Sequence, residues 1–286
     1  MRQRNLIALP LALAASLALS ACVGGTSTAS TGGEGLPAEI AASGKLRVGL
    51  SANLPPMEFK DDSGKYAGAD VDLQQELGKA LGVEIEIVES PFDQLINSAQ
   101  TGRVDIVMSG MSDTAERQKT ADFVDYFKSE GRLFTTGKRA KDFTSDDDIC
   151  GKKIAVSGKT DYYAQVTALG KAECTDKGKP GVELLSTDSG TAARLQIDQG
   201  RADLAAQSAE NLAYFEQTDP GKYKNVLDPL PSKPLGILVK KGNDQLSGAV
   251  LKALQKMRED GTYDEVLKKW NIDYGAMEPA INGATS

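Results

Sequence analysis

The chain has 286 residues, more than one hydrophobic core usually organises, and this length predicts two domains. Hydrophobic residues make up 40% and charged residues 26%, as in soluble globular proteins, and the net charge of −7 argues against nucleic acid as a partner. The sequence has no histidine, so the commonest metal ligand and the commonest general base are missing. Its three cysteines lack paired C-x-x-C spacing, which argues against structural zinc, and we expect no metal and no cofactor.

The N-terminus has the pattern of an export signal. Two arginines precede the apolar run "LIALPLALAASLALSA" (6–21), which is short for a membrane-spanning helix of about 20 residues. "LSAC" (19–22) resembles the bacterial lipobox, in which the cysteine is lipidated and becomes the new N-terminus; an ordinary signal peptide is the alternative. We therefore expect residues 1–21 to be removed and Cys22 to anchor the protein by lipid, outside the cytoplasm.

A stretch rich in Gly, Ser and Thr follows, "VGGTSTASTGGEG" (23–35). Such a composition cannot bury a core and behaves as a flexible chain. We expect residues 22–44, which begin with the lipidated cysteine, to form a tether, and the folded part to begin near Lys45.

Two cysteines, Cys150 and Cys174, remain once Cys22 is used for lipidation. In an oxidising compartment an even pair favours a disulfide. Cys150 precedes a predicted strand and Cys174 follows a predicted helix, so a bridge between them would be structural. Two free thiols are the alternative.

The first half of the folded part alternates between strand and helix patterns. Apolar residues of 71–82 recur near helical spacing and glycine ends that segment, whereas 83–88 alternates as a strand does. In chain order we expect a strand at 46–50, a helix at 71–82, a strand at 83–88, a helix at 92–102 and a strand at 103–108. This order predicts parallel strands joined by crossover helices.

The pattern recurs in the second half, where "DQGRADLAAQS" (198–208) resembles "QTGRVDIVMSG" (100–110). We expect a strand at 152–156, a helix at 161–170, a strand at 182–186, a helix at 191–200, a strand at 201–207, a further strand at 235–240 and helices at 244–261 and 263–270. Two similar α/β lobes followed by a late return of the chain predict two crossing segments. A ligand cleft is expected where the lobes face one another.

Three long segments carry a resemblance to a known family. They are "LRVGLSANLPPMEFKDDSGKYAGADVDL" (46–73), "GRVDIVMSGMSDTAERQKTADFVDYF" (102–127) and "GILVKKGNDQLSGAVLKALQKMREDGTYDEVLKKW" (236–270). In that order they resemble the opening, the central signature and the C-terminal end of the cluster 3 bacterial solute-binding proteins, which serve ABC importers of polar amino acids. The resemblance covers about 45–272.

The resemblance implies an α/β protein with the two-lobe, type II periplasmic-binding-protein fold: two mixed sheets flanked by helices and joined by two hinge crossovers. Mapped onto this chain, lobe 1 comprises 45–130 and 234–275, lobe 2 comprises 131–233, and 276–286 form a C-terminal tail. In the family the lobes close on the ligand by a hinge motion, because the ligand contacts both of them.

In this family the arginine of an S-x-T-x-x-R motif holds the ligand carboxylate, and here the motif is Ser112, Thr114 and Arg117. A guanidinium group suits that role because its planar fork binds a carboxylate with two hydrogen bonds. The Ser112 hydroxyl and nearby helix N–H groups could add donors. The alternative is a surface Arg117 that pairs with Asp113 or Glu116.

Further contacts follow from the same resemblance. Ser109 and Gly110 map to a strand end that presents backbone and hydroxyl groups to the ligand. Thr160 maps to a lobe 2 residue that also holds the carboxylate. Phe92 maps to an aromatic wall, with ordinary core as its alternative.

Several positions depart from the family pattern. The family aspartate that binds the ligand ammonium falls at Ser208, and a serine cannot neutralise a buried cation. Glu210 or Asp161 could take its place. Other departures remove the usual partner of a basic side chain and two aromatic residues, at Ser51, Leu54 and Met57.

Two ligand classes are therefore open. One is an α-amino acid without a basic side chain; the other is an organic acid or an amine-modified amino acid. Lys159 could meet a second anionic group, with a solvated lysine as the alternative. The expected ligand-contacting residues are Ser51, Leu54, Met57, Phe92, Ser109, Gly110, Met111, Ser112, Arg117, Lys159, Thr160, Asp161 and Ser208.

The sequence thus predicts a monomeric substrate-binding lipoprotein that passes a small carboxylate-bearing solute to an ABC transporter permease. Relatives on the same fold include dehydratases of cyclohexadienyl acids, whose chemistry needs a placed acid or base. Glu58, Asp161 and Glu210 are possible carboxylates for it, but none has a partner or spacing that singles it out. We expect binding without catalysis.

Overall fold

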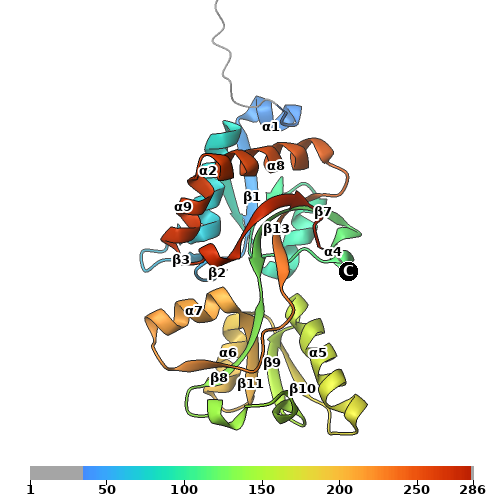
Figure 1. Ribbon diagram of the computed structural model, residues 1–286. Helices are drawn as coiled ribbons and strands as arrows, with labels where there is room; N and C mark the ends of the chain where they lie inside the picture. The colour runs from blue at the N-terminus through green and yellow to red at the C-terminus, as the bar shows by residue number, and fades with distance from the viewer. Residues whose placement is uncertain (1–34, 285–286) are drawn as a thin grey trace, which may run out of the picture. The chain divides into compact units, whose positions relative to one another are not determined.

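The structure of the chain, a computed structural model, describes residues 35–284. The predicted signal peptide, the lipidated Cys22 and most of the predicted tether lie outside the described residues. Within them, helices flank two separate mixed β-sheets (Figure 1). A third, antiparallel sheet has only the short strands β2 (Asn53–Leu54), β3 (Glu58–Lys60) and β4 (Tyr66–Ala67). No helix in this part of the chain is long and apolar enough to cross a membrane.

The larger sheet has six strands in the order β14-β7-β13-β6-β1-β5. Strand β1 runs parallel to β5 and β6, whereas β13 runs antiparallel to β6 and β7. Its strands are β1 (Lys45–Leu50), β5 (Glu84–Glu89), β6 (Ile106–Val107), β7 (Ala121–Ser129), β13 (Lys233–Lys240) and β14 (Ala276–Ile281). The helices that pack with it are α2 (Ala69–Leu81), α3 (Leu95–Gln100), α4 (Ala115–Gln118), α8 (Asp244–Glu259) and α9 (Thr262–Lys269).

The second sheet has five strands in the order β10-β9-β11-β8-β12. Strands β10, β9 and β11 run parallel, and β8 runs antiparallel to β11 and β12. Its strands are β8 (Gly131–Thr136), β9 (Lys153–Ser157), β10 (Glu183–Thr187), β11 (Leu204–Ser208) and β12 (Tyr223–Val226). Its helices are α5 (Asp161–Glu173), α6 (Gly190–Asp198) and α7 (Ala209–Thr218).

The chain passes between the two sheets twice. Strand β7 ends at Ser129 and β8 begins at Gly131; β12 ends at Val226 and β13 begins at Lys233. We call the two parts the six-stranded lobe and the five-stranded lobe. Mixed sheets flanked by helices confirm the predicted fold class, while the residue limits given for the lobes stay a prediction.

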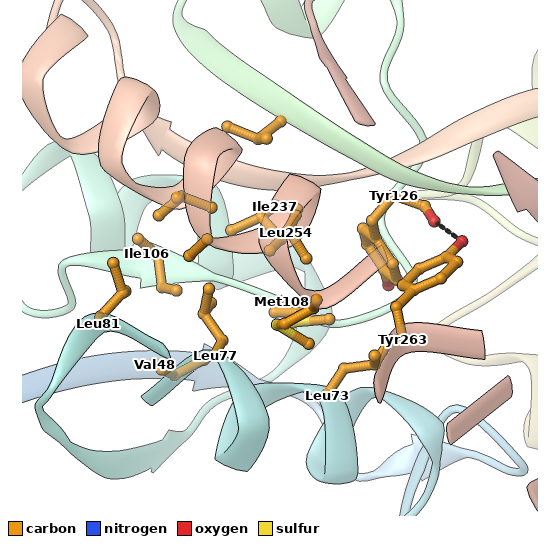
Figure 2. Packing of buried hydrophobic residues seen from close by; sticks show 14 of the residues in the cluster. Val48, Leu73, Leu77, Leu81, Ile106, Met108, Tyr126, Ile237, Leu254 and Tyr263 are labelled. Carbon is orange, nitrogen blue, oxygen red and sulfur yellow. Dashed lines mark hydrogen bonds between the residues drawn. The ribbon is translucent and has the colours of Figure 1, made fainter. Parts of the chain in front are cut away.

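The core of the six-stranded lobe follows from the spacing of its apolar residues. Leu73, Leu77 and Leu81 lie four residues apart on α2, so they share one face of the helix and are buried. Figure 2 shows this stripe packed against residues of β1 and α8. The Tyr263 hydroxyl donates to the Tyr126 backbone carbonyl, so the one polar atom of a fully buried ring is satisfied.

The structure differs from the sequence prediction at both ends of the folded part. Helix α1 (Ala38–Ser43) falls inside the predicted tether, and Leu36 and Ile40 are buried in the core. At the other end, β14 (Ala276–Ile281) pairs with β7, where a tail was predicted. Local composition had suggested loop in both places, but packing against the rest of the lobe orders them.

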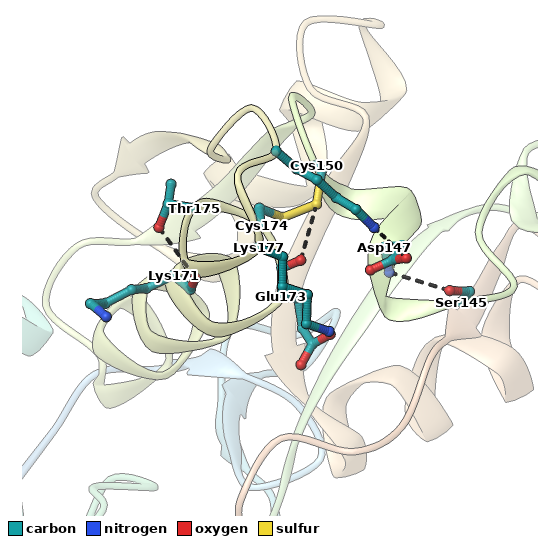
Figure 3. Close-up of a disulfide and its surroundings, with 9 residues drawn as sticks. Ser145, Asp147, Cys150, Lys171, Glu173, Cys174, Thr175 and Lys177 are labelled. Carbon is teal, nitrogen blue, oxygen red and sulfur yellow. Dashed lines mark hydrogen bonds and ion pairs between the residues drawn. A yellow bond between two sulfur atoms is a disulfide. The ribbon is translucent and has the colours of Figure 1, made fainter.

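The disulfide predicted between Cys150 and Cys174 is present (Figure 3). Cys150 follows the 3₁₀ turn Asp146–Ile149, and Cys174 ends α5, with their Cα atoms 5.4 Å apart. Closing a loop of this length stabilises a fold by about 3 kcal/mol, because it restricts the unfolded chain. The bridge ties the end of α5 to the segment that precedes β9.

Candidate ligand-binding site

A cavity lies between the two lobes. It holds about 760 Å³ of space free of protein atoms, its open mouth included. Its walls are Asn53, Leu54, Met57, Glu58, Phe92, Gly110, Ser112, Arg117, Ser129, Ser157, Thr160, Asp161, Tyr162, Asp188, Ser189, Gly190, Ala206, Gln207, Ser208, Glu210 and Leu235. Because both lobes contribute, a solute in this cavity would contact the two together.

Arg117 is the cation of this cavity wall. Thr114 precedes α4 and accepts the Arg117 backbone N–H at 3.3 Å, so the motif's threonine caps the short helix that carries the arginine. The guanidinium donates to the Ser112 carbonyl at 2.7 Å and to the Lys159 carbonyl at 3.1 Å, and it lies 5.9 Å from the centre of the Phe92 ring. Burial lowers the pKa of Arg117, but guanidinium groups stay charged in proteins.

The alternative partners considered for Arg117 are engaged elsewhere. Asp113 is buried and accepts both the Gln118 amide and the Ala284 backbone N–H. Glu116 pairs with Lys119 on the exposed face of α4. Within residues 35–284, Arg117 therefore forms no ion pair, although the nearby charges of Asp161 and Asp113 attract it.

Asp161 and Ser112 join the two lobes beside this arginine. The Ser112 hydroxyl donates to Asp161 Oδ1 at 2.9 Å, and Gln165 donates to Asp161 Oδ2 at 2.7 Å. Thr160, just before α5, donates its hydroxyl to the Ser157 carbonyl at 2.8 Å. The side chains of Asp161 and Thr160 are thus already hydrogen-bonded within the protein.

The structure brings most of the predicted contact residues to the cavity, but four of them do not line it. Ser51 lies behind the wall, where its backbone N–H donates to Ser109 Oγ, which in turn donates to Glu58. Met111 is fully buried in a core cluster with Leu95 and Phe123. The fourth residue, Lys159, faces solvent.

Lys159 is exposed and does not border the cavity. It contributes only its backbone carbonyl, which accepts from Arg117. The solvated alternative for its side chain therefore agrees with the structure, and a second anionic group of the ligand would not meet it there.

Glu58 forms a buried carboxyl pair with Asp70. Asp70 accepts from the Tyr126 hydroxyl at 2.7 Å and from the Gly110 backbone N–H at 2.9 Å, and these donors favour its charged form. Burial, followed by repulsion from Asp70, raises the pKa of Glu58 well above its ordinary range, and burial raises that of Asp70 to about 6. The raised pKa of Glu58 favours its neutral form where it borders the cavity.

Glu210 and Ser208 lie at the start of α7. The Ser208 hydroxyl accepts the Asn211 backbone N–H at 3.3 Å, so Ser208 serves as the N-cap of the helix. Glu210 is almost fully buried and accepts from Ser129 Oγ at 3.0 Å. Burial raises its pKa to about 7. The Asn211 amide crosses to the six-stranded lobe and donates to the Pro55 carbonyl at 2.5 Å.

Sequence reasoning missed several residues of the wall, among them Ser129, Tyr162, Asp188, Gln207 and the role of Glu58. They come from different elements, and no spacing in the sequence connects them. The one usable signal was Glu58, an acidic residue between apolar neighbours in a segment that resembled the family.

The model for the bacterial extracellular solute-binding proteins, family 3, matches residues 46–273. The chain belongs to this family. The putative ABC transporter arginine-binding protein 2 of Escherichia coli (strain K12) is 31% identical, over 82% of this chain and 94% of its own length. The L-cystine-binding protein TcyJ of the same strain is 30% identical, over 87% of this chain and 91% of its own length.

Among solved structures, an ancestral amino acid-binding protein described as a precursor of cyclohexadienyl dehydratase is similar, with a TM-score of 0.72. It shares 32% identity, and the match covers 81% of this chain and 97% of that one. The relatives are binding proteins for amino acids, and this family-3 protein is accordingly a solute-binding protein of an amino-acid-binding, extracytoplasmic family.

Proposed function

We propose that this family-3 protein is the substrate-binding component of an ABC importer and captures a small amino acid through its carboxylate. The observation that carries the proposal is Arg117, which borders the cavity without an ion-pair partner in the described part of the chain. Two of the five N–H donors of its guanidinium are used by carbonyls, which leaves three for a carboxylate. A bidentate bond to the solute would complete them.

The rest of the wall supports a polar amino acid without a basic side chain. Leu54, Met57 and Phe92 make an apolar surface, and burial with repulsion from Asp70 raises the pKa of Glu58, which favours its neutral form. A buried ammonium or guanidinium side chain would need an ionised carboxylate, and this part of the wall offers none.

An organic acid or an amine-modified amino acid is the second candidate. It is favoured by Ser208, whose hydroxyl is neutral and is already occupied as a helix cap.

Catalysis of the cyclohexadienyl-dehydratase kind is not part of the proposal. Incubation with prephenate or arogenate, followed by a search for aromatic product, tests that point directly, and product formation at a constant rate per protein would overturn it.

The proposal extends to the cell surface. Lipidation at Cys22 would hold the protein at the outer side of the membrane, and closure of the two lobes around the solute would present one compact surface to a permease. Growth with radiolabelled glycerol and palmitate precursors, comparing wild type with Cys22→Ser, tests the anchor; equal labelling of both forms would contradict it.

The binding role is tested by calorimetry and thermal shift on the chain starting at residue 35. A bound solute at about 100 times its dissociation constant should stabilise the protein by about 2.7 kcal/mol. Arg117→Ala should weaken binding of any carboxylate-bearing solute by at least about 30-fold, because a charge-assisted pair is lost. Arg103→Ala, at an exposed position outside the cavity, is the matched control. Unchanged affinity in Arg117→Ala would refute the role of this arginine.

A further inference from the structure

Glu210 has a carboxylate oxygen that nothing in the protein satisfies. The residue is 1% exposed, yet it borders the ligand cavity from the first turn of α7. Its Oε2 accepts from Ser129, whereas Oε1 has no hydrogen-bond donor anywhere in residues 35–284. A buried polar atom without a partner costs free energy unless something else pairs with it. At the wall of a solute cavity, the solute itself can be that partner.

The other carboxyl groups of the cavity are in different surroundings. Both oxygens of Asp161 accept hydrogen bonds from the protein, whereas burial and repulsion from Asp70 raise the pKa of Glu58, which favours its neutral form. Asp188 is exposed, so water solvates its charge. Glu58 Oε2 also lacks a hydrogen-bond donor in residues 35–284, so Glu58 and Glu210 are the two buried, incompletely paired carboxyl groups of the wall. Of these two, Glu210 lies on the lobe opposite Arg117.

The groups that face Glu210 do not neutralise it. Glu130, at the first crossover, adds repulsion, and Arg132 on β8 pairs with Glu130 at 2.7 Å. Tyr162 on α5 and Tyr274 in the turn before β14 also face Glu210. Burial, with repulsion from nearby carboxylates that include Glu210, raises the pKa of both phenols, so they carry no positive charge to it. Burial, with repulsion from Glu130 added, places the pKa of Glu210 at about 7. A cation brought by the solute would be its first positive partner.

We propose that Glu210 binds the ammonium group of a zwitterionic solute whose carboxylate Arg117 holds, an assignment that rests on the proposed binding function. Arg117 belongs to the six-stranded lobe and Glu210 to the five-stranded lobe. A solute that pairs with both would hold the lobes together by its two charges. The site then selects amino acids over organic acids of the same shape, through a residue two positions beyond the helix cap Ser208.

This assignment has a consequence for the effect of pH. A proton on Glu210 competes with the ammonium group, so binding of an amine requires the ionised form. Affinity for an amino acid should fall by up to about tenfold for each pH unit below 7, until the pKa of the bound form is reached. Affinity for the corresponding acid without an amine should not fall in this way.

The experiment measures dissociation constants by calorimetry from pH 5 to pH 8. The probes are the standard L-amino acids and, for each one that binds, its α-hydroxy and N-acetyl counterparts. The variants are Glu210→Gln, which keeps size and removes charge, and Glu130→Gln, a neighbouring carboxyl outside the cavity wall. Glu210→Gln should weaken amino-acid binding by about 10- to 100-fold at pH 8 and abolish its dependence on pH below 7. Glu130→Gln should retain that dependence.

The outcomes separate this inference from the function on which it rests. If Arg117→Ala loses amino-acid binding while Glu210→Gln keeps wild-type affinity and pH dependence, the role of Glu210 is refuted and the binding function stands. If wild type binds only the α-hydroxy or N-acetyl forms, the assignment is also refuted. If no carboxylate-bearing solute binds, or Arg117→Ala changes nothing, the binding function fails and this inference with it. Thermal unfolding of each variant without solute verifies that it is folded.

Discussion

Asp125 and Asp113 form a second buried carboxyl pair, which holds the C-terminal segment against the loop that carries the arginine. Both are fully buried. Asp125 accepts the Gly283 backbone N–H at 2.8 Å, and Asp113 accepts that of Ala284 at 3.1 Å. Burial, together with repulsion from Asp113, raises the pKa of Asp125 from 3.8 to about 7. Below about pH 7 Asp125 is therefore protonated, which removes its repulsion with Asp113.

The sign of the pH dependence follows from the raised pKa. The folded protein keeps this proton up to about pH 7, whereas the unfolded chain releases it near pH 4. Since the folded state binds more protons in that interval, the free energy of unfolding falls as the pH rises from about 4 to 7, and the loss is complete above 7. A difference of about 3 pH units, at about 1.36 kcal/mol each, sets an upper bound of about 4 kcal/mol on this loss.

Asp125→Asn removes this titration and the repulsion from Asp113. The gain in unfolding free energy over wild type should grow from about 1 kcal/mol at pH 4.5 to about 4 kcal/mol at pH 8, as measured by urea unfolding across that range. Asp122→Asn, on the same strand, is the control of opposite sign. Lys241 and Asn282 lower the pKa of Asp122, so its carboxylate stabilises the fold above the unfolded pKa and that contribution is lost as the pH falls. The difference in unfolding free energy between wild type and Asp125→Asn should change with pH. A difference that stays constant would refute the raised pKa of Asp125.

Three further predictions concern the fold. Replacing Cys150 and Cys174 together by serine should lower the free energy of unfolding by about 3 kcal/mol, and reductant should have no further effect on the double variant; an unchanged urea midpoint would show that the bridge adds no stability. Gly68→Ala should lower the melting temperature sharply, because φ is 128° and a Cβ would lie 2.1 Å from the Met57 carbonyl oxygen; a wild-type melt would contradict that geometry. Leu77→Ala should cost about 2 to 5 kcal/mol in chemical unfolding, and a loss below 1 kcal/mol would mean that the α2 stripe is not core.

The family, the element order and the position of Ser112 and Arg117 at one place in the cavity wall could be predicted from the sequence, because each depends on residues that are close along the chain. The helix predicted at 71–82 is α2, Ala69–Leu81, and the one predicted at 244–261 is α8, Asp244–Glu259, because apolar residues at helical spacing report directly on a buried face. Ser112 and Arg117 lie in one turn of chain, so their meeting needed no knowledge of the fold.

The charge state of the site was decided only by the tertiary structure. Whether Glu58 is an ionised carboxylate or a neutral acid depends on Asp70, and whether Glu210 has a free oxygen depends on Ser129, 81 residues away. The same holds for β14, whose sequence reads as a tail until β7 offers it a strand edge. Burial and pairing between distant segments set the pKa and hydrogen bonding of a side chain, and both are properties of its surroundings rather than of the residue or its near neighbours.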